Sequence, residues 1–246
     1  MPRTSFGSVP LIQGADINSN STTQLMPLGA YAETPDGRGF RYVLNGGTST
    51  VAGRIYQAPA EDATNFQSLT ITNAAVGDMS IVSTTTKTIS ADQSTNLAGG
   101  YVTVISATTG SGRSYKIKSV PAVTAAAVTI NLEEPVAVAT TGTAIIDMHP
   151  NPYSGVIITP AGSATSSPVG VSTYVITNAK YGWLQVRGPA PVLSSTAMTV
   201  GNNVMPLFAT AAGAGSAAID GVKASIGYAL TGIATTDVGL VHLTIG

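Results

Sequence analysis

The chain has 246 residues, of which 43% are hydrophobic and only 9% are charged, and its 11 basic and 12 acidic side chains give a formal net charge of -1. Soluble domains usually contain about 25% charged residues, so this surface must consist largely of Thr, Ser, Asn, Gly and Ala, which cost little free energy to dehydrate when a partner docks. Scattered basic residues, apolar runs far shorter than a membrane span and the lack of cysteine argue against a nucleic-acid partner, a membrane partner, disulfides and thiolate metal sites.

Strong helix formers are sparse along the chain, while Thr, Val, Ile and Ser are abundant. The 27 glycines and 14 prolines are spread throughout. This pattern is typical of many short strands joined by frequent turns. The sequence therefore predicts an all-β protein built from antiparallel β-barrel or β-sandwich units.

Residues 1–35 are predicted to form an extended N-terminal arm. A polar stretch at residues 16–24 lies between two short apolar flanks at 9–12 and 25–28, and neither flank is long enough to form a core. We expect this arm to be ordered mainly by contact with another subunit. The alternative is a disordered terminus.

A first β domain is predicted over residues 36–158. Phe40, Tyr42 and Leu44 alternate with other residues along 39–44, as in a half-buried strand. The Asn-Gly-Gly sequence at 45–47 favours a turn, and residues 51–56 can form the returning strand.

The densest series of strand patterns in this domain lies between residues 66 and 150. In residues 115–118, Tyr115 and Ile117 fall on one face and two lysines on the other. The glycine-rich residues 109–112 indicate a hairpin. Antiparallel strands at this spacing favour a barrel or sandwich, with candidates at residues 68–72, 80–83, 101–106, 114–120, 128–132 and 143–148.

Residues 159–170 are predicted to be a linker, because the tract 160–168 has no side chain large enough to start a core. A second β unit is predicted over residues 171–246. The Ala/Gly-rich stretch at 209–218 fits either a loop or a short helix. The strand candidates of this unit are residues 171–176, 181–187, 198–200, 204–208, 226–230 and 238–245.

No arrangement of residues predicts catalysis, a cofactor or a metal site. His149 and His242 are isolated in the sequence; His149 stands at the end of a predicted strand and His242 lies within the last one. The adjacent carboxylates at 61–62 and 133–134 would point to opposite faces of a strand, so neither pair converges on one bond. We therefore expect a protein that is not an enzyme.

Large apolar side chains are the candidates for an interface with another subunit or protein. Tyr181 and Trp183 share one face of a predicted strand and could instead form a platform for sugars, but we favour an interface anchor. The candidate interface residues are Val9, Leu11, Ile12, Leu25, Met26, Leu28, Tyr181 and Trp183.

Short segments across most of the chain resemble structural proteins of tailed-bacteriophage virions, of the head decoration or cement type. These segments carry no catalytic signature and look like elements of fold and packing. They are PLGAY (27–31), GRGFRY (37–42), GRIYQAP (53–59), AGGYVTV (98–104), GRSYKIK (112–118), NPY (151–153), YGWLQVRGPA (181–190) and IGYAL (226–230).

The resemblance implies an all-β protein on the outer surface of the capsid, where it bridges capsomers. It implies the major capsid protein as the partner and self-association as a homotrimer, and it transfers no functional residue. The alternatives are another virion part, such as a tail tube or fibre subunit, or a carbohydrate-binding adhesin module. A major capsid protein is disfavoured, because the usual shell subunit of tailed phages carries a long helix and none is predicted here.

Overall fold

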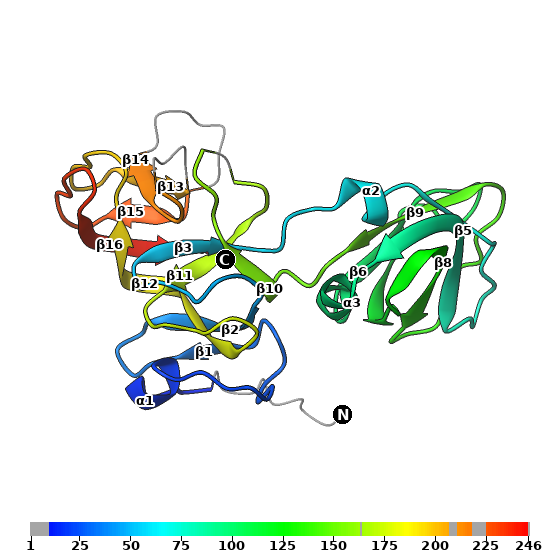
Figure 1. The fold of residues 1–246 in the computed structure, drawn as a ribbon, viewed down its shortest axis with the longest axis horizontal. Coiled ribbons are helices and arrows are strands. Elements are labelled where there is room, and N and C mark those ends of the chain that lie inside the picture. Colours follow the sequence, from blue (N-terminus) through cyan, green and yellow to red (C-terminus); the bar gives the residue numbers. More distant parts are fainter. Residues whose placement is uncertain (1–9, 163, 207–210, 218–224, 246) are drawn as a thin grey trace, which may run out of the picture. The chain divides into compact units, whose positions relative to one another are not determined.

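The computed structural model describes residues 10–162, 164–206, 211–217 and 225–245, and most of its regular structure is strand. The helices in these ranges are short: α1 (Gly14–Ile17), α2 (Ala63–Phe66) and α3 (Ala91–Leu97). The prediction of an all-β fold is confirmed. Figure 1 labels these helices and most of the strands along the chain.

The chain forms two compact units whose boundaries differ from the predicted ones. The inserted unit is Pro59–Gly155, and the discontinuous unit combines Met1–Ala58 with Val156–Gly246. The predicted boundary at 158 and the predicted linker at 159–170 therefore do not separate the units. The physical reason is strand pairing across the insertion, because β3 (Arg54–Gln57) pairs with β10 (Ser154–Ile158) and β11 (Pro168–Ser172).

The inserted unit is a closed antiparallel barrel with strand order β4-β5-β8-β7-β6-β9. The predicted hairpin at 109–112 is confirmed, since it joins β6 to its antiparallel partner β7. Closure pairs every strand of the barrel on both sides. The strands are β4 (Leu69–Ile71), β5 (Ser80–Ile89), β6 (Tyr101–Ser106), β7 (Ser114–Ser119), β8 (Val123–Leu132) and β9 (Ala144–His149).

The barrel core follows the alternation of side chains in the sequence. Tyr115 and Ile117 are buried in it, while Lys116 and Lys118 lie outside. Helix α3 begins at a capping box in which the Ser90 side chain accepts from the Gln93 backbone N–H and the Gln93 side chain accepts from the Ser90 backbone N–H. The core of the barrel consists mainly of Ile, Val and Leu side chains, and all of them come from this unit.

The discontinuous unit contains the remaining strands, in the order β1-β2-β10-β3-β11-β12-β16-β15-β13-β14. An additional pairing of β2 with β12 closes the strands β2, β10, β3, β11 and β12 into a ring. The strands not yet bounded are β1 (Tyr31–Glu33), β2 (Gly39–Asn45), β12 (Tyr181–Leu193), β13 (Asn203–Pro206), β14 (Gly215–Ala217), β15 (Gly227–Ala229) and β16 (Val238–Thr244).

Strand β12 has 13 residues and connects the two parts of this sheet. Its first half pairs with β2, and its second half, from Arg187 onward, pairs with β16. Close packing requires a glycine at position 182, because a Cβ there would lie 2.7 Å from Cγ1 of Ile176. The predicted strand at 39–44 is confirmed as β2, but the predicted hairpin with residues 51–56 is wrong, because β2 is flanked by β1, β10 and β12 instead of β3.

From residue 10 onward the N-terminal segment lies along its own unit. The backbone N–H of Ile12 donates to the Glu33 carbonyl at 2.8 Å, and Ser21 and Tyr181 exchange two backbone hydrogen bonds. Ile12 and Ile17 are buried against aromatic residues of the sheet. These hydrogen bonds and contacts are made within one chain, and contact of the arm with another subunit stays a prediction.

We predict that Ile117→Ala destabilises the inserted unit by about 2–5 kcal/mol, because it removes a fully buried side chain from the barrel core. The matched control is Ile105→Ala on neighbouring strand β6, where the isoleucine is 46% exposed and the cost should be below about 0.5 kcal/mol. Urea unfolding followed by circular dichroism measures both. Equal costs for the two variants would contradict the barrel.

Candidate functional site

Three aromatic rings gather where β2 and β12 pair. Trp183 lies directly opposite Tyr42 in the register, and Tyr181, two residues before Trp183, shares its face of the sheet. The rings of Tyr42 and Tyr181 are nearly parallel, with centroids 6.0 Å apart. Trp183 meets Tyr42 edge to face, at 5.1 Å between centroids. Such pairs stabilise a sheet beyond the area they bury.

The N-terminal segment covers this aromatic cluster. Ile12 and Ile17 are buried against it, and Met26 packs at its side. The backbone N–H of Leu25 donates to the Tyr42 hydroxyl at 3.1 Å, which ties the segment to the sheet. Burial raises the pKa of the Tyr42 hydroxyl above its ordinary value.

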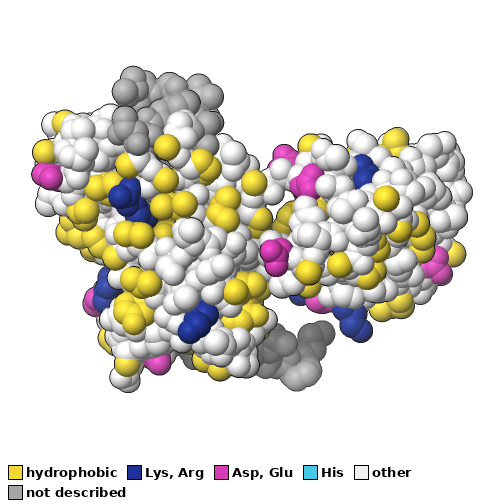
Figure 2. All heavy atoms as spheres, viewed as in Figure 1, with side chains coloured by type: hydrophobic (Ala, Val, Ile, Leu, Met, Phe, Trp, Pro, Cys, Tyr) yellow, Lys and Arg dark blue, Asp and Glu magenta, His cyan; other side chains and the backbone are white. Residues whose placement is uncertain are grey.

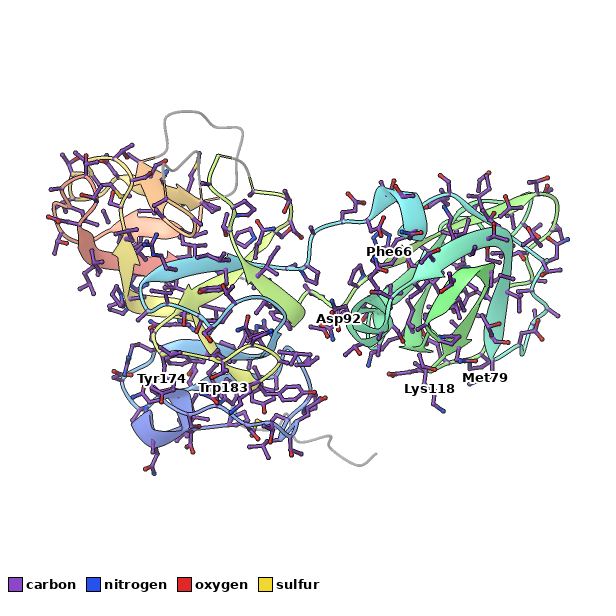
Figure 3. All side chains as sticks on the ribbon, in the orientation of Figure 1. Phe66, Met79, Asp92, Lys118, Tyr174 and Trp183 are labelled. Carbon is purple, nitrogen blue, oxygen red and sulfur yellow. The ribbon has the colours of Figure 1, made fainter. Side chains whose placement is uncertain are left out.

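A cavity of about 250 Å³ remains between the segment and the sheet, and we call it the aromatic pocket. Figure 3 shows Trp183 on this part of the discontinuous unit. Apolar and aromatic side chains form most of the wall, and among the described residues Asp16 is the only charged one that lines it. The wall consists of Leu11, Ile12, Asp16, Ser19, Asn20, Ser21, Leu25, Met26, Tyr42, Tyr181, Gly182 and Trp183.

Most residues predicted from sequence to form an interface meet at this pocket. Leu11 and Leu25 are each 72% exposed at its edge, whereas Ile12 is buried. Leu28 packs against the cluster without lining the pocket. Val9 lies outside the described residues. The remaining three residues of the prediction, Met26, Tyr181 and Trp183, line the pocket.

Trp183 is only 6% exposed, so its ring does not present an open platform on which a sugar could stack. It acts as a packing anchor of the cluster. Sequence reasoning missed Tyr42 and Asp16 as pocket residues. The alternation in residues 39–44 placed Tyr42 on an apolar face, but the partner of that face depends on pairing with a strand about 140 residues away.

A second surface lies at the other end of β12, on the sheet formed with β16 and β15. Leu240 faces Pro191 and Val238 faces Leu193 across the β12–β16 pairing. Tyr228 of β15 faces His242, with ring centroids 5.1 Å apart and planes at 16°. We call this surface the β16 face; its members are Pro189, Pro191, Leu193, Tyr228, Val238, Leu240 and His242.

The opposite side of the same strands is the core of the unit. Ala190, Val192, Val241 and Leu243 alternate with the residues of the β16 face and are buried. On the β16 face Val238 is 57% exposed, and Tyr228 and Leu240 about two-fifths exposed. Both sides of this sheet are therefore apolar, and among the described residues only the core side is buried against other parts of the chain.

Charged side chains are sparse on the face in view in Figure 2, as the composition requires. On the barrel, Nζ of Lys116 lies 3.0 Å from Oε2 of Glu133. In the discontinuous unit, Nη1 of Arg187 lies 3.5 Å from Oε1 of Glu33. His149 is exposed on β9. Within the described ranges no group of three or more His, Asp or Glu side chains is placed to hold a metal ion.

Comparison with known proteins gives no match: no family model matches the chain, and neither a curated protein nor a solved structure is significantly similar to it. In the part of the chain that the structure describes, every helix is too short to cross a membrane.

We predict that Trp183→Ala lowers the free energy of unfolding by about 3–5 kcal/mol, because it empties the centre of the aromatic cluster. Tyr228→Ala is the control, since it removes an aromatic ring that is 40% exposed; its cost should stay below about 1 kcal/mol. Urea unfolding followed by circular dichroism measures both variants. A Trp183→Ala protein as stable as the wild type would show that the ring is not a packing anchor.

Proposed function

We propose that this chain is a non-enzymatic decoration protein of a phage capsid, which binds the outer capsid surface and stabilises the head by bridging capsomers. The observation that carries the proposal is the β16 face, an exposed apolar surface on a sheet whose other side is already buried. Contiguous apolar surface of this kind marks protein-binding sites. The resemblance of the sequence to head decoration proteins indicates that the partner is a capsid protein.

The β16 face supports docking by a sheet surface. Its rows contain no Lys, Arg, Asp or Glu between Pro189 and Leu193 on β12 or between Val238 and His242 on β16. A partner can therefore cover it without removing an unpaired full charge from water. The central part of stable interfaces is likewise depleted in charged residues.

The prolines of β12 favour face-to-face docking over the addition of a strand at its edge. The backbone N–H of Leu193 points away from β16. On that side it donates to the Gly53 carbonyl at 2.8 Å. Backbone groups of alternate residues in a strand point to the same side, so Pro189 and Pro191 occupy the corresponding positions and have no N–H to offer. Proline at such positions blocks pairing with a further strand.

The low charge of the chain fits a protein that is covered by many neighbours. A decoration protein attaches at repeated positions, and several weak contacts of an oligomer add to a strong attachment. We propose that the oligomer is a homotrimer and that the major capsid protein is its partner.

Other virion parts, such as a tail tube or fibre subunit, would use the same apolar face and remain the second candidate. A carbohydrate-binding module has less support, because the ring of Trp183 is covered. The position of the chain in the particle distinguishes decoration from tail or fibre, and electron microscopy of virions labelled with an antibody against this chain measures it.

We predict that Leu240→Glu weakens attachment to empty heads of the corresponding phage at least about tenfold, because docking would bury an unpaired carboxylate. The melting temperature should change little, since Leu240 is 39% exposed. Co-sedimentation with the heads measures attachment. The matched control is Val200→Glu in the same unit, where the valine is 69% exposed and outside the β16 face; equal attachment by all three proteins would refute a role for this face.

We also predict that the isolated protein is a trimer, with a mass three times the 24.7 kDa of one chain. Light scattering after size-exclusion chromatography measures the mass over a range of concentrations. A monomer that fails to bind empty heads would contradict the decoration function.

A further inference from the structure

We propose that the aromatic pocket binds the side chain of an arginine presented by a partner protein. The inference rests on the proposed function only for the source of the arginine, a protein surface. The chemistry that selects the side chain belongs to the pocket itself and can be tested on the isolated chain.

The charge of the pocket favours a cation. Within the described ranges, Asp16 is its only charged lining residue, and no Lys, Arg or His side chain lies within 4.0 Å of the Asp16 carboxylate. One carboxylate oxygen accepts the Gln13 backbone N–H at 3.1 Å. Gln13 supplies a hydrogen bond but no charge, so the carboxylate has no ionic partner among the described residues. A cation that enters the pocket gains a charge-assisted hydrogen bond.

The aromatic wall favours a flat cation. A guanidinium group stacks on electron-rich rings and at the same time donates in its plane to a carboxylate, which an ammonium group does less well. Tyr181 is partly exposed, its ring is nearly parallel to that of Tyr42, and both residues line the cavity. The rings can contact the face of a guanidinium while Asp16 accepts hydrogen bonds from its edge.

The size and edge of the pocket fit one long side chain. Its volume of about 250 Å³ is smaller than the volume of roughly 300–1,000 Å³ that is usual for sites that bind whole small molecules. Leu11 and Leu25, both largely exposed at the edge, offer apolar contact to a methylene stem. Arginine combines such a stem with a planar charged end.

Three polar side chains of the pocket each make a hydrogen bond within the protein, which leaves fewer groups to bind the hydroxyls of a sugar. The Ser19 hydroxyl donates to the Asp16 carbonyl at 2.9 Å, and the Asn20 amide donates to the Val175 carbonyl at 3.1 Å. Ser21 accepts the Thr23 backbone N–H at 3.0 Å. A sugar needs several hydrogen-bonding groups free to face its hydroxyls, whereas a guanidinium needs chiefly the carboxylate.

Trp183 is the only tryptophan of the chain and lies in the pocket wall, so its fluorescence reports occupancy directly. The test is a titration of the isolated full-length protein with butylguanidinium, the end group and stem of arginine. We expect a saturable change that weakens about tenfold in Asp16→Asn, because asparagine keeps the hydrogen bond to Gln13 and removes the charge. The matched control Asp237→Asn removes an exposed carboxylate of the same unit that does not line the pocket and should bind as the wild type does.

Further probes separate the components of recognition. Tyr181→Leu should also weaken binding, because it keeps an apolar side chain and removes the ring. Neutral butylurea and methyl glucoside should not bind measurably, and butylammonium should bind more weakly than butylguanidinium. Binding of butylurea or methyl glucoside as tight as that of butylguanidinium, or an Asp16→Asn titration identical to the wild type, would overturn the proposal. Because no capsid is present, failure here is separate from failure to attach to heads.

Discussion

The structure of the discontinuous unit depends on strand β12, which is long enough to take part in two different sets of pairings. Its first half is held by β2 and its second half by β16, so the strand belongs both to the ring of strands and to the sheet that continues to β14. Residues 182–186 are buried whichever way they point, and from Arg187 onward the pattern changes to strict alternation. A strand with this change in burial faces protein on both sides at one end and only on one side at the other.

The two candidate surfaces are consequences of that change. At the first end, Trp183 and Tyr181 meet Tyr42, and the N-terminal segment closes over them to leave the aromatic pocket. At the second end, the same alternation that buries Ala190 and Val192 leaves prolines outside. The chain thus offers a small pocket with one negative charge and a neutral apolar face. The pocket suits recognition of a single side chain, and the face suits the burial of area, so the two would contribute specificity and affinity respectively.

The barrel is inserted into the sequence of the discontinuous unit, but the strands of that unit on either side of the insertion still pair with one another. Its own strands are joined by local connections and close on themselves, and its core contains residues of the insertion alone. The discontinuous unit is held together across the insertion by β3, which pairs with β10 and β11. Because these pairings link residues about 100 positions apart, the discontinuous unit has the longer-range contacts of the two, and contacts of this kind are the slower to form in folding.

The sequence by itself determined the all-β class, most strand positions and the inward faces of strands such as β7, because side-chain alternation and turn residues are local signals. It also singled out most of the apolar residues that line the pocket, because two short apolar flanks enclose a polar stretch in the N-terminal segment and because Tyr181 and Trp183 share a strand face. Only the tertiary structure decided the domain boundaries, the partner of β2, and the meeting of Tyr42 and Asp16 with Trp183. These depend on pairing between segments far apart in the chain, and a strand pattern specifies which face is buried without specifying which strand lies beside it.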